Sequence, residues 1–248
     1  MSKSAAALAP LPFELVLDDG EPLESEWHTL QYPLLRELIG QAMKEQGRSD
    51  FYVGGNMFVY YSLEQARAVY DEVLEQRETK RAFRGPDVFW VGGVDPTRKR
   101  PAWIAWKEGG KLPDVIVELS SPSTAHKDRT EKKELYARVF GTAEYFLYDP
   151  ETRELEGWRL AQKFYRPIQP DESGRLWSEQ LGVFFGLWPG TVQRSEYDWV
   201  RLFRPGGSLV PTEAEAERQR AEVETQRAEA AEAENARLRA LLKELGKG

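Results

Sequence analysis

The chain has 248 residues and a formal net charge of −7, and 41% of its residues are hydrophobic. This length and apolar content suit one packed globular domain with room for an appendage. Because the chain has no cysteine, disulfides and thiolate metal sites are excluded, and a metal held by oxygen atoms, or by His28 and His126, favours magnesium or manganese.

The first part of the chain predicts two helices around a strand. Residues 30–45 carry apolar side chains at helical spacing, with polar residues between them. Residues 50–61 are rich in aromatic and β-branched residues, and the break at Gly54 and Gly55 predicts a bulge or a close backbone approach. Residues 63–77 predict a second helix that Ser62 caps.

The middle of the chain predicts a run of strands at 87–94, 102–107 and 114–119, separated by turns. A helix is expected at about 129–140, with Asp128 and Glu131 spaced as a capping box. Further strands are expected at 144–148, as a pair within 155–168, and at 181–187. This order predicts an α/β or α+β fold with a central mixed sheet flanked by helices.

Composition changes after Pro211. Residues 213–245 consist almost entirely of Ala, Glu, Arg, Gln and Leu and lack Gly and Pro, which predicts one long helix. The stripe formed by Leu238, Leu241, Leu242 and Leu245 leaves two interpretations open: a solvated helix or weak coiled coil, and self-association through its end. We expect a flexible segment at 1–20, a domain at 21–205 and a helical or coiled-coil tail at 212–248.

The strongest chemical signal lies in residues 113–133. Glu118 stands deep in the apolar run 115–119, where a charge needs a metal, a partner or a catalytic task. Asp114 shares its strand face but lies roughly 13 Å along the strand, too far to bind the same ion. Asp87, at the start of an earlier predicted strand, can reach Glu118 if the two strands are neighbours in the sheet.

The joint spacing of several motifs resembles the Uma2 family of restriction endonucleases, which belongs to the PD-(D/E)XK nuclease superfamily. The motifs are ESEWH at 24–28, GGNMF at 54–58, RGPD at 84–87, PDVIVELSSPST at 113–124, Asp128 with Lys132 and Tyr136, EYF at 144–146, and Asp149 with Pro150. The resemblance covers roughly residues 20–205, and the helical tail is a variable addition in such proteins.

The resemblance implies a restriction-endonuclease-like core, in which acids from two strands hold a divalent metal and a lysine positions the attacking water. Asp87 matches the first acid and Glu118 the second, with the Leu119 carbonyl as a further ligand. Ser120 stands where the superfamily has its lysine. Lys132 on the next helix is therefore expected to take that role, with Lys133 as the fallback.

The implied activity is hydrolysis of DNA phosphodiester bonds with Mg²⁺ or Mn²⁺. Glu26, Asp114, Ser120 and Lys133 are candidate auxiliary residues. An alternative stays open, in which a catalytically inactive nuclease fold serves as a binding or scaffold module and associates through its C-terminal helix. The replacement of the lysine by Ser120 favours this alternative, as does the acidic net charge, because neutralising phosphates supplies most non-specific affinity for nucleic acids.

Structural roles are also open for several of these residues. Pro-Asp pairs are common at strand entries, and Asp128 fits a helix N-cap better than a metal ligand. His28 and His126 have no second histidine at ligand spacing, so we expect structural or surface roles for both. For Glu118 the alternative role is a buried ion pair with a partner such as Lys132.

The sequence also predicts the location of the protein and its partners. Residues 1–12 lack the basic start and apolar run of an export signal, and no stretch approaches the roughly 20 apolar residues of a membrane span. We expect a cytoplasmic protein, without membrane contact, that forms a homodimer or homo-oligomer. Local basic groups at 77–84, 98–100 and 127–133 leave two interpretations open, which are solvated charges on helices and turns and contact with DNA.

Overall fold

The computed structural model describes residues 25–74, 85–121 and 124–245. The segment expected to be flexible, 1–20, lies outside the described residues, and so do the basic group at 77–84 and the last three residues of the predicted tail.

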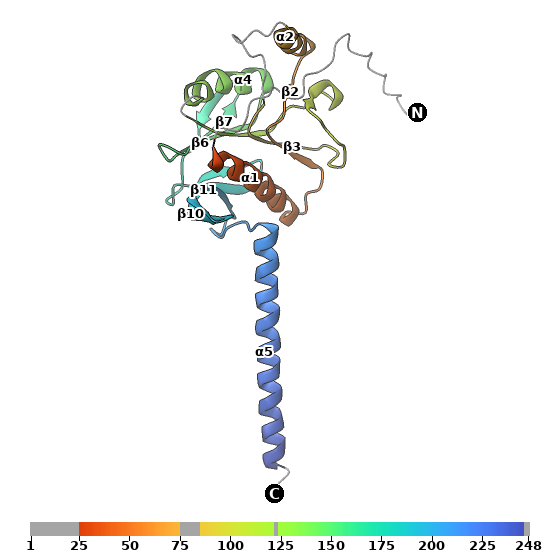
Figure 1. Ribbon diagram of the computed structural model, residues 1–248, viewed down its shortest axis with the longest axis vertical. Coiled ribbons are helices and arrows are strands. Elements are labelled where there is room, and N and C mark those ends of the chain that lie inside the picture. Colours follow the sequence, from red (N-terminus) through yellow and green to blue (C-terminus); the bar gives the residue numbers. More distant parts are fainter. Residues whose placement is uncertain (1–24, 75–84, 122–123, 246–248) are drawn as a thin grey trace, which may run out of the picture.

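A six-stranded mixed sheet forms the centre of the fold and confirms the predicted fold class (Figure 1). Only β5 and β6 are parallel; all other neighbours in this sheet are antiparallel. The helical segment 125–140 connects the two parallel strands, because parallel neighbours need a long crossover. In spatial order the strands are β1 (Phe51–Gly54), β3 (Val88–Gly92), β5 (Val115–Leu119), β6 (Glu144–Asp149), β7 (Glu154–Ala161) and β8 (Phe164–Pro167).

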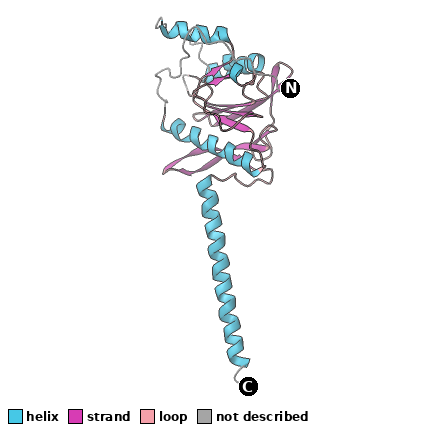
Figure 2. Cartoon of the chain, turned by 90° about the vertical axis from the view of Figure 1, so that its right-hand side faces the viewer, coloured by secondary structure: helices cyan, strands magenta, loops and turns pink. Residues whose placement is uncertain are grey.

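The two faces of this sheet are covered by different layers. Val115, Val117 and Leu119 pack with helix α1 (Glu26–Glu45) and with a second sheet of β9 (Leu176–Ser178), β10 (Val183–Val192) and β11 (Ser195–Phe203). Figure 2 shows α1 between the two sheets. Ile116 packs on the opposite face with Tyr136 of the helical segment. Glu118, two residues after Ile116, therefore points toward that segment.

The helical segment alternates between α and π geometry. It comprises α3 (Ala125–Lys127), the π-helical turn η2 (Asp128–Lys132), α4 (Lys133–Leu135) and a second π-helical turn η3 (Tyr136–Phe140), and it ends at Gly141 in the left-handed conformation. The predicted start near residue 129 was wrong by one turn. The predicted capping box was wrong as well, because Asp128 lies inside the helix.

Two predicted strands are shorter in the structure. Residues 50–61 divide into β1 and β2 (Val59–Tyr60) at Gly55, where a Cβ atom would collide with the Asp87 carbonyl oxygen. Residues 102–107 form β4 (Trp103–Ile104) and then the 3₁₀ turn η1 (Ala105–Lys107). β4 pairs in parallel with β2 in a small separate sheet, next to helix α2 (Leu63–Leu74). β3 and β5 thus remain direct neighbours.

The predicted tail is a single helix, α5 (Glu213–Leu245), which projects from the domain (Figure 1). A capping box fixes its first turn: Thr212 Oγ1 accepts from the Glu215 amide, and Glu215 Oε2 accepts from the Thr212 amide. The same carboxylate binds both terminal nitrogens of the buried Arg201 on β11. Of the described helices, none combines the length and the apolar character that crossing a bilayer requires.

Candidate metal and catalytic site

Asp87 and Glu118 meet because β3 and β5 are antiparallel neighbours. The last pair of their ladder is Val88 with Val117, so Asp87, one residue before Val88, lies beside Glu118. The Asp87 carboxylate accepts a hydrogen bond from the Leu119 amide at 2.6 Å, and the Glu118 carboxyl group is within hydrogen-bonding reach. The structure thus brings together the two acids that the sequence singled out.

Leu119 is the residue at which β5 extends past β3. In a strand, the N–H and C=O of one residue point to the same side, and here that side has no strand partner. Asp87 binds the amide, and the Nε2 atom of His28 on α1 lies 2.8 Å from the Leu119 carbonyl oxygen. The backbone of Leu119 therefore connects Asp87, Glu118 and α1.

Lys132 lies between two acids on the helical segment's side of the sheet. Its Nζ atom is 3.1 Å from Glu118 Oε2 and 2.8 Å from Asp128 Oδ1. Tyr136, four residues later, donates to Glu118 Oε1 at 2.6 Å. Asp128, Lys132 and Tyr136 are spaced by four residues, and the wider π-helical turns keep all three on the face that meets Glu118.

Ser120 does not contact the acid pair as a catalytic lysine would. Its hydroxyl group donates to Asp128 Oδ2 at 3.3 Å, and the residue is fully buried. Ser120 therefore helps to hold Asp128, which in turn holds Lys132.

The charges of this site are unbalanced, with three carboxyl groups around one ammonium. Burial raises the pKa of Asp87 and raises that of Glu118 well above its usual range; the charges of Asp87 and Asp128 add to the effect at Glu118, while Lys132 opposes it. Burial disfavours the charged form of Lys132, but its three carboxyl neighbours outweigh this and raise its pKa. Lys132 is therefore a permanent cation at neutral pH.

The donor set at this place suits a hard divalent cation. Glu118 Oε2 and Asp128 Oδ1 are buried, and in the described part of the chain the Lys132 ammonium is the only group that lies near them as a donor. Within the same residues, no three acidic or imidazole side chains converge as metal ligands. A metal here would rest on Asp87, Glu118 and the Leu119 carbonyl, with water completing its shell, as magnesium commonly does.

Three of the candidate auxiliary residues make other contacts. Asp114 Oδ2 accepts from the Gly92 amide at 2.8 Å and closes the end of the β3–β5 pair. Glu26 accepts from Ser195 Oγ and from the Tyr197 hydroxyl group on β11. The ammonium of Lys133 lies 3.6 Å from the centre of the Trp158 ring, whereas its neighbour Lys132 contacts the acids.

Sequence reasoning assigned no role in the site to Asp128, Tyr136 or His28. The spacing of Asp128, Lys132 and Tyr136 is a usable signal, since residues four apart share a helix face. No comparable signal exists for His28, whose contact with Leu119 spans 91 residues of sequence.

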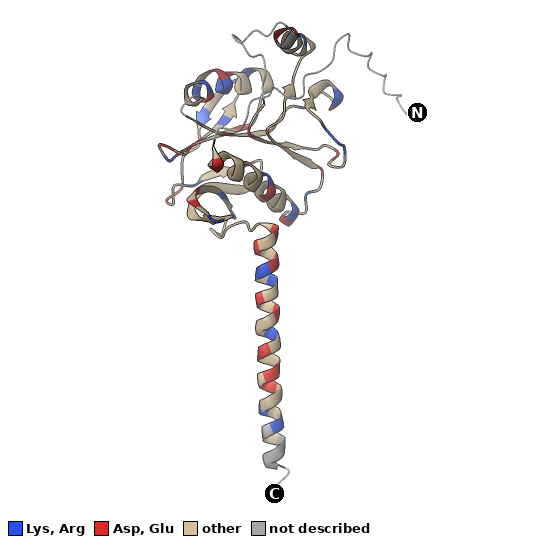
Figure 3. Ribbon diagram, in the orientation of Figure 1, with Lys and Arg blue, Asp and Glu red and all other residues tan. Residues whose placement is uncertain are grey.

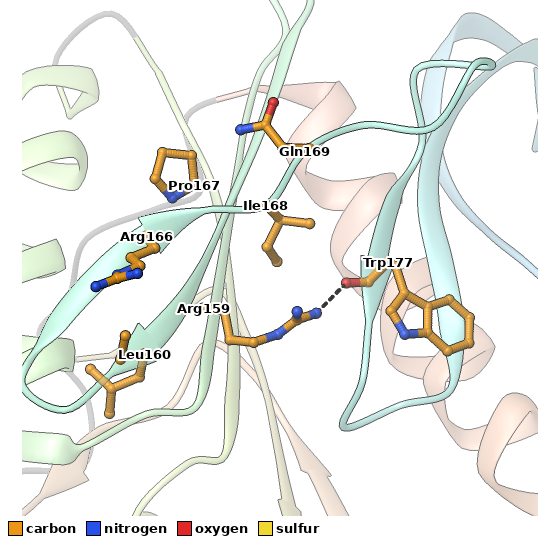
Figure 4. Close-up of a pocket in the computed structure, with 8 residues that line it drawn as sticks. Arg159, Leu160, Arg166, Pro167, Ile168, Gln169 and Trp177 are labelled. Atoms are coloured by element: carbon orange, nitrogen blue, oxygen red, sulfur yellow. Dashed lines mark hydrogen bonds between the residues drawn. The ribbon is translucent and has the colours of Figure 1, made fainter.

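The structure also has a surface pocket away from the acids. A pocket of about 370 Å³ lies beside β7 and β8 and contains Arg159 and Arg166 (Figure 4). Arg159 donates to the Trp177 carbonyl oxygen at 3.0 Å and pairs with Glu144, at the opposite end of β6 from the acids. None of the acids at Lys132 lines this pocket.

Comparison with known families finds a match for most of the chain. The family model Uma2, described as "putative restriction endonuclease", matches residues 11–193, a range that contains every residue of the site. A search of curated proteins found no match to this chain.

Proposed function

Since the chain belongs to the Uma2 family of restriction-endonuclease-like proteins, we propose that it is a magnesium-dependent endonuclease that hydrolyses phosphodiester bonds of DNA. The observation that carries the proposal is the contact of Asp87, Glu118 and Lys132, which come from two neighbouring strands and the following helix. Two acids and a lysine in contact are the groups that metal-assisted phosphodiester hydrolysis uses.

In this proposal Asp87, Glu118 and the Leu119 carbonyl hold the cation. When bound, Mg²⁺ polarises the phosphate and lowers the pKa of a bound water. Lys132 is the residue that orients the attacking water and offsets the negative charge that grows on the phosphate. Asp128 and Tyr136 keep Lys132 and Glu118 in place for these tasks.

The inactive binding module remains the second candidate. The observation that favours it is the use of Ser120 as a hydrogen-bond donor to Asp128, in place of a lysine beside the acids. In this case α5 would be the working part of the molecule. The two candidates differ in one measurable property, which is cleavage of DNA.

The test is plasmid cleavage with Mg²⁺ or Mn²⁺ by the full chain and its variants. We expect Asp87→Ala and Glu118→Ala each to lower the cleavage rate by at least about 100-fold, the usual effect of removing a group that stabilises transition-state charge. Glu134→Ala is the control, because that acid pairs with Arg138 on the exposed face of the helical segment. Equal cleavage by wild type and both acid variants would refute the proposed site.

A pair of neighbouring lysines sharpens this assay. Lys132→Met removes the ammonium that contacts Glu118, whereas Lys133→Met removes the one over Trp158. Only Lys132→Met is expected to abolish cleavage. The opposite result would move the catalytic role to Lys133, and an inactive wild-type protein would favour the binding module.

A further inference from the structure

The Leu119 carbonyl is bound by a side chain that the proposed function does not use. His28 comes from α1, on the face of the sheet opposite the helical segment, and its side chain is buried with 9% exposure. Its Nε2 atom is 2.8 Å from this carbonyl oxygen. A carbonyl oxygen only accepts hydrogen bonds, so Nε2 carries the proton and donates it.

The ring of His28 is held in this orientation from its other side. Because Nε2 carries the proton, Nδ1 accepts a hydrogen bond at 2.7 Å from the hydroxyl group of Ser25, the N-cap residue of α1. The same hydroxyl oxygen accepts from the His28 amide at 3.3 Å. Trp27 packs edge-on against the imidazole, with ring centres 5.1 Å apart. A neutral imidazole with its proton on Nε2 has a single tautomer, and it can donate a hydrogen bond only toward the Leu119 carbonyl.

We propose that His28 is a positioning residue of the metal centre, which holds the Leu119 carbonyl beside Asp87 and Glu118. This inference rests on the proposed function. The carbonyl oxygen has two lone pairs, so the hydrogen bond from His28 leaves one for a cation. Side chains that hold a metal's ligands in this way strengthen binding although they do not touch the metal.

The backbone of Leu119 connects His28 to both acids through two successive peptide groups. The Leu119 amide donates to Asp87, and Glu118 is the residue before it. A Leu119 carbonyl released from His28 is free to turn toward water, because β3 has already ended. The backbone of Leu119, which holds Asp87 through its amide and follows Glu118 directly, then loses its fixed position.

Gln31 offers a matched control on the same face of α1. Its side chain is fully buried, and its amide binds both backbone groups of Val200 on β11. Both His28→Ala, which removes one hydrogen bond, and Gln31→Ala, which removes two, break buried hydrogen bonds between α1 and a strand, but only His28 binds the backbone beside the acids. A merely structural role of His28 would give the two variants the same properties.

The experiment is calorimetric titration of the full chain with MnCl₂ and MgCl₂, beside thermal unfolding. We expect both alanine variants to unfold at a lower temperature, and His28→Ala alone to weaken metal binding by about 10- to 100-fold. His28→Gln, whose amide nitrogen can reach the position of Nε2, is expected to restore most of the affinity. Glu118→Gln is expected to abolish binding.

The outcomes separate this inference from the function on which it rests. Wild-type affinity in His28→Ala, together with loss of binding in Glu118→Gln, would overturn the role of His28 and leave the metal site standing. Equal weakening in Gln31→Ala would also overturn it, because the effect would then come from α1 packing. No metal binding by the wild-type protein would overturn both.

Discussion

Tyr136 connects the helical segment to a buried acid of the site, Glu118. The Tyr136 hydroxyl group is fully buried and donates to Glu118 Oε1, which leaves Oε2 facing Lys132. Hydrogen bonds to carboxylates are among the stronger ones in proteins. This hydrogen bond therefore fixes Oε2 as the Glu118 oxygen that contacts the Lys132 ammonium.

Tyr136→Phe removes this hydroxyl group and almost nothing else. We expect the free energy of unfolding to fall by about 1.5–3 kcal/mol, the usual value of a hydrogen bond to a charged group, and metal affinity to fall with it. The measurements are urea unfolding and metal titration. Tyr165→Phe is the control, because that hydroxyl group donates to the Thr142 carbonyl oxygen away from the site. Unchanged stability and affinity in Tyr136→Phe would contradict this role.

The residues of the site differ in how far the sequence could predict them. Glu118 stands out because acids are rare in apolar strands, whereas the roles of Asp87 and Lys132 follow from the family resemblance. Asp128 resembled a helix cap, since helix starts depend on tertiary contacts that spacing does not record. The sequence predicts a structural or surface role for His28, because no second histidine stands at ligand spacing. Its contact with Leu119 could not be predicted, because the partner is a backbone atom and backbone atoms leave no mark in a sequence.

The strands also differ in how far the sequence could predict them. β5 and β6 were predicted from their apolar runs, which suit strands buried on both faces. β11 was missed, and β10 was expected to end near Leu187 because Pro189 and Gly190 resemble a turn. β10 nevertheless continues through Pro189, because β9 pairs only with its first residues and the proline therefore has no strand on one side.

The first turn of α5 is fastened by a charged pair. Arg201 is 1% exposed and Glu215 is 37% exposed, and the two side chains form two hydrogen bonds. Partial burial disfavours the Glu215 carboxylate, but the hydrogen bonds from Arg201 and from the Thr212 amide outweigh this and lower its pKa. Ionised Glu215 therefore stabilises the folded chain above the ordinary carboxyl pKa, and this stabilisation is lost as the pH falls through the lowered value.

Glu215→Gln tests this anchor through its pH dependence. At pH 7 we expect a loss of about 2–3 kcal/mol, somewhat less than for a fully buried pair because Glu215 is partly exposed. The gap in melting temperature between wild type and variant should narrow below about pH 4.3, where carboxyl groups of the unfolded chain become protonated. Glu213→Gln, in the same helical turn, should show no such gap. A gap that stays constant from pH 7 to pH 3 would contradict the assignment.

The whole molecule consists of a packed domain and a helix that projects from it. Acidic and basic residues alternate along α5 (Figure 3), and Leu238 and Leu241 near its end are 48% and 46% exposed. A helix with so little contact to its own domain gains most from a partner helix. We therefore keep self-association through the leucines as our proposal for this part of the chain.

Leu238→Glu combined with Leu241→Glu tests self-association in the full chain. We expect the wild-type protein to have at least twice the chain mass in light scattering, and the double variant to be monomeric, because charges on the stripe oppose close helix packing. Ala236→Glu, at an exposed position on the opposite side of the same helix, is the control. A monomeric wild-type protein, or an unchanged mass in the double variant, would contradict the proposal.

The central proposal for the domain is that Asp87 and Glu118 hold a divalent cation between them. The most direct measurement is an anomalous difference map from crystals soaked in MnCl₂, for the wild-type protein and for Glu118→Gln. We expect a manganese peak between the two carboxyl groups and beside the Leu119 carbonyl in the wild type, and no peak there in the variant. Manganese bound only elsewhere in the wild-type crystals, with this position empty, would contradict the account.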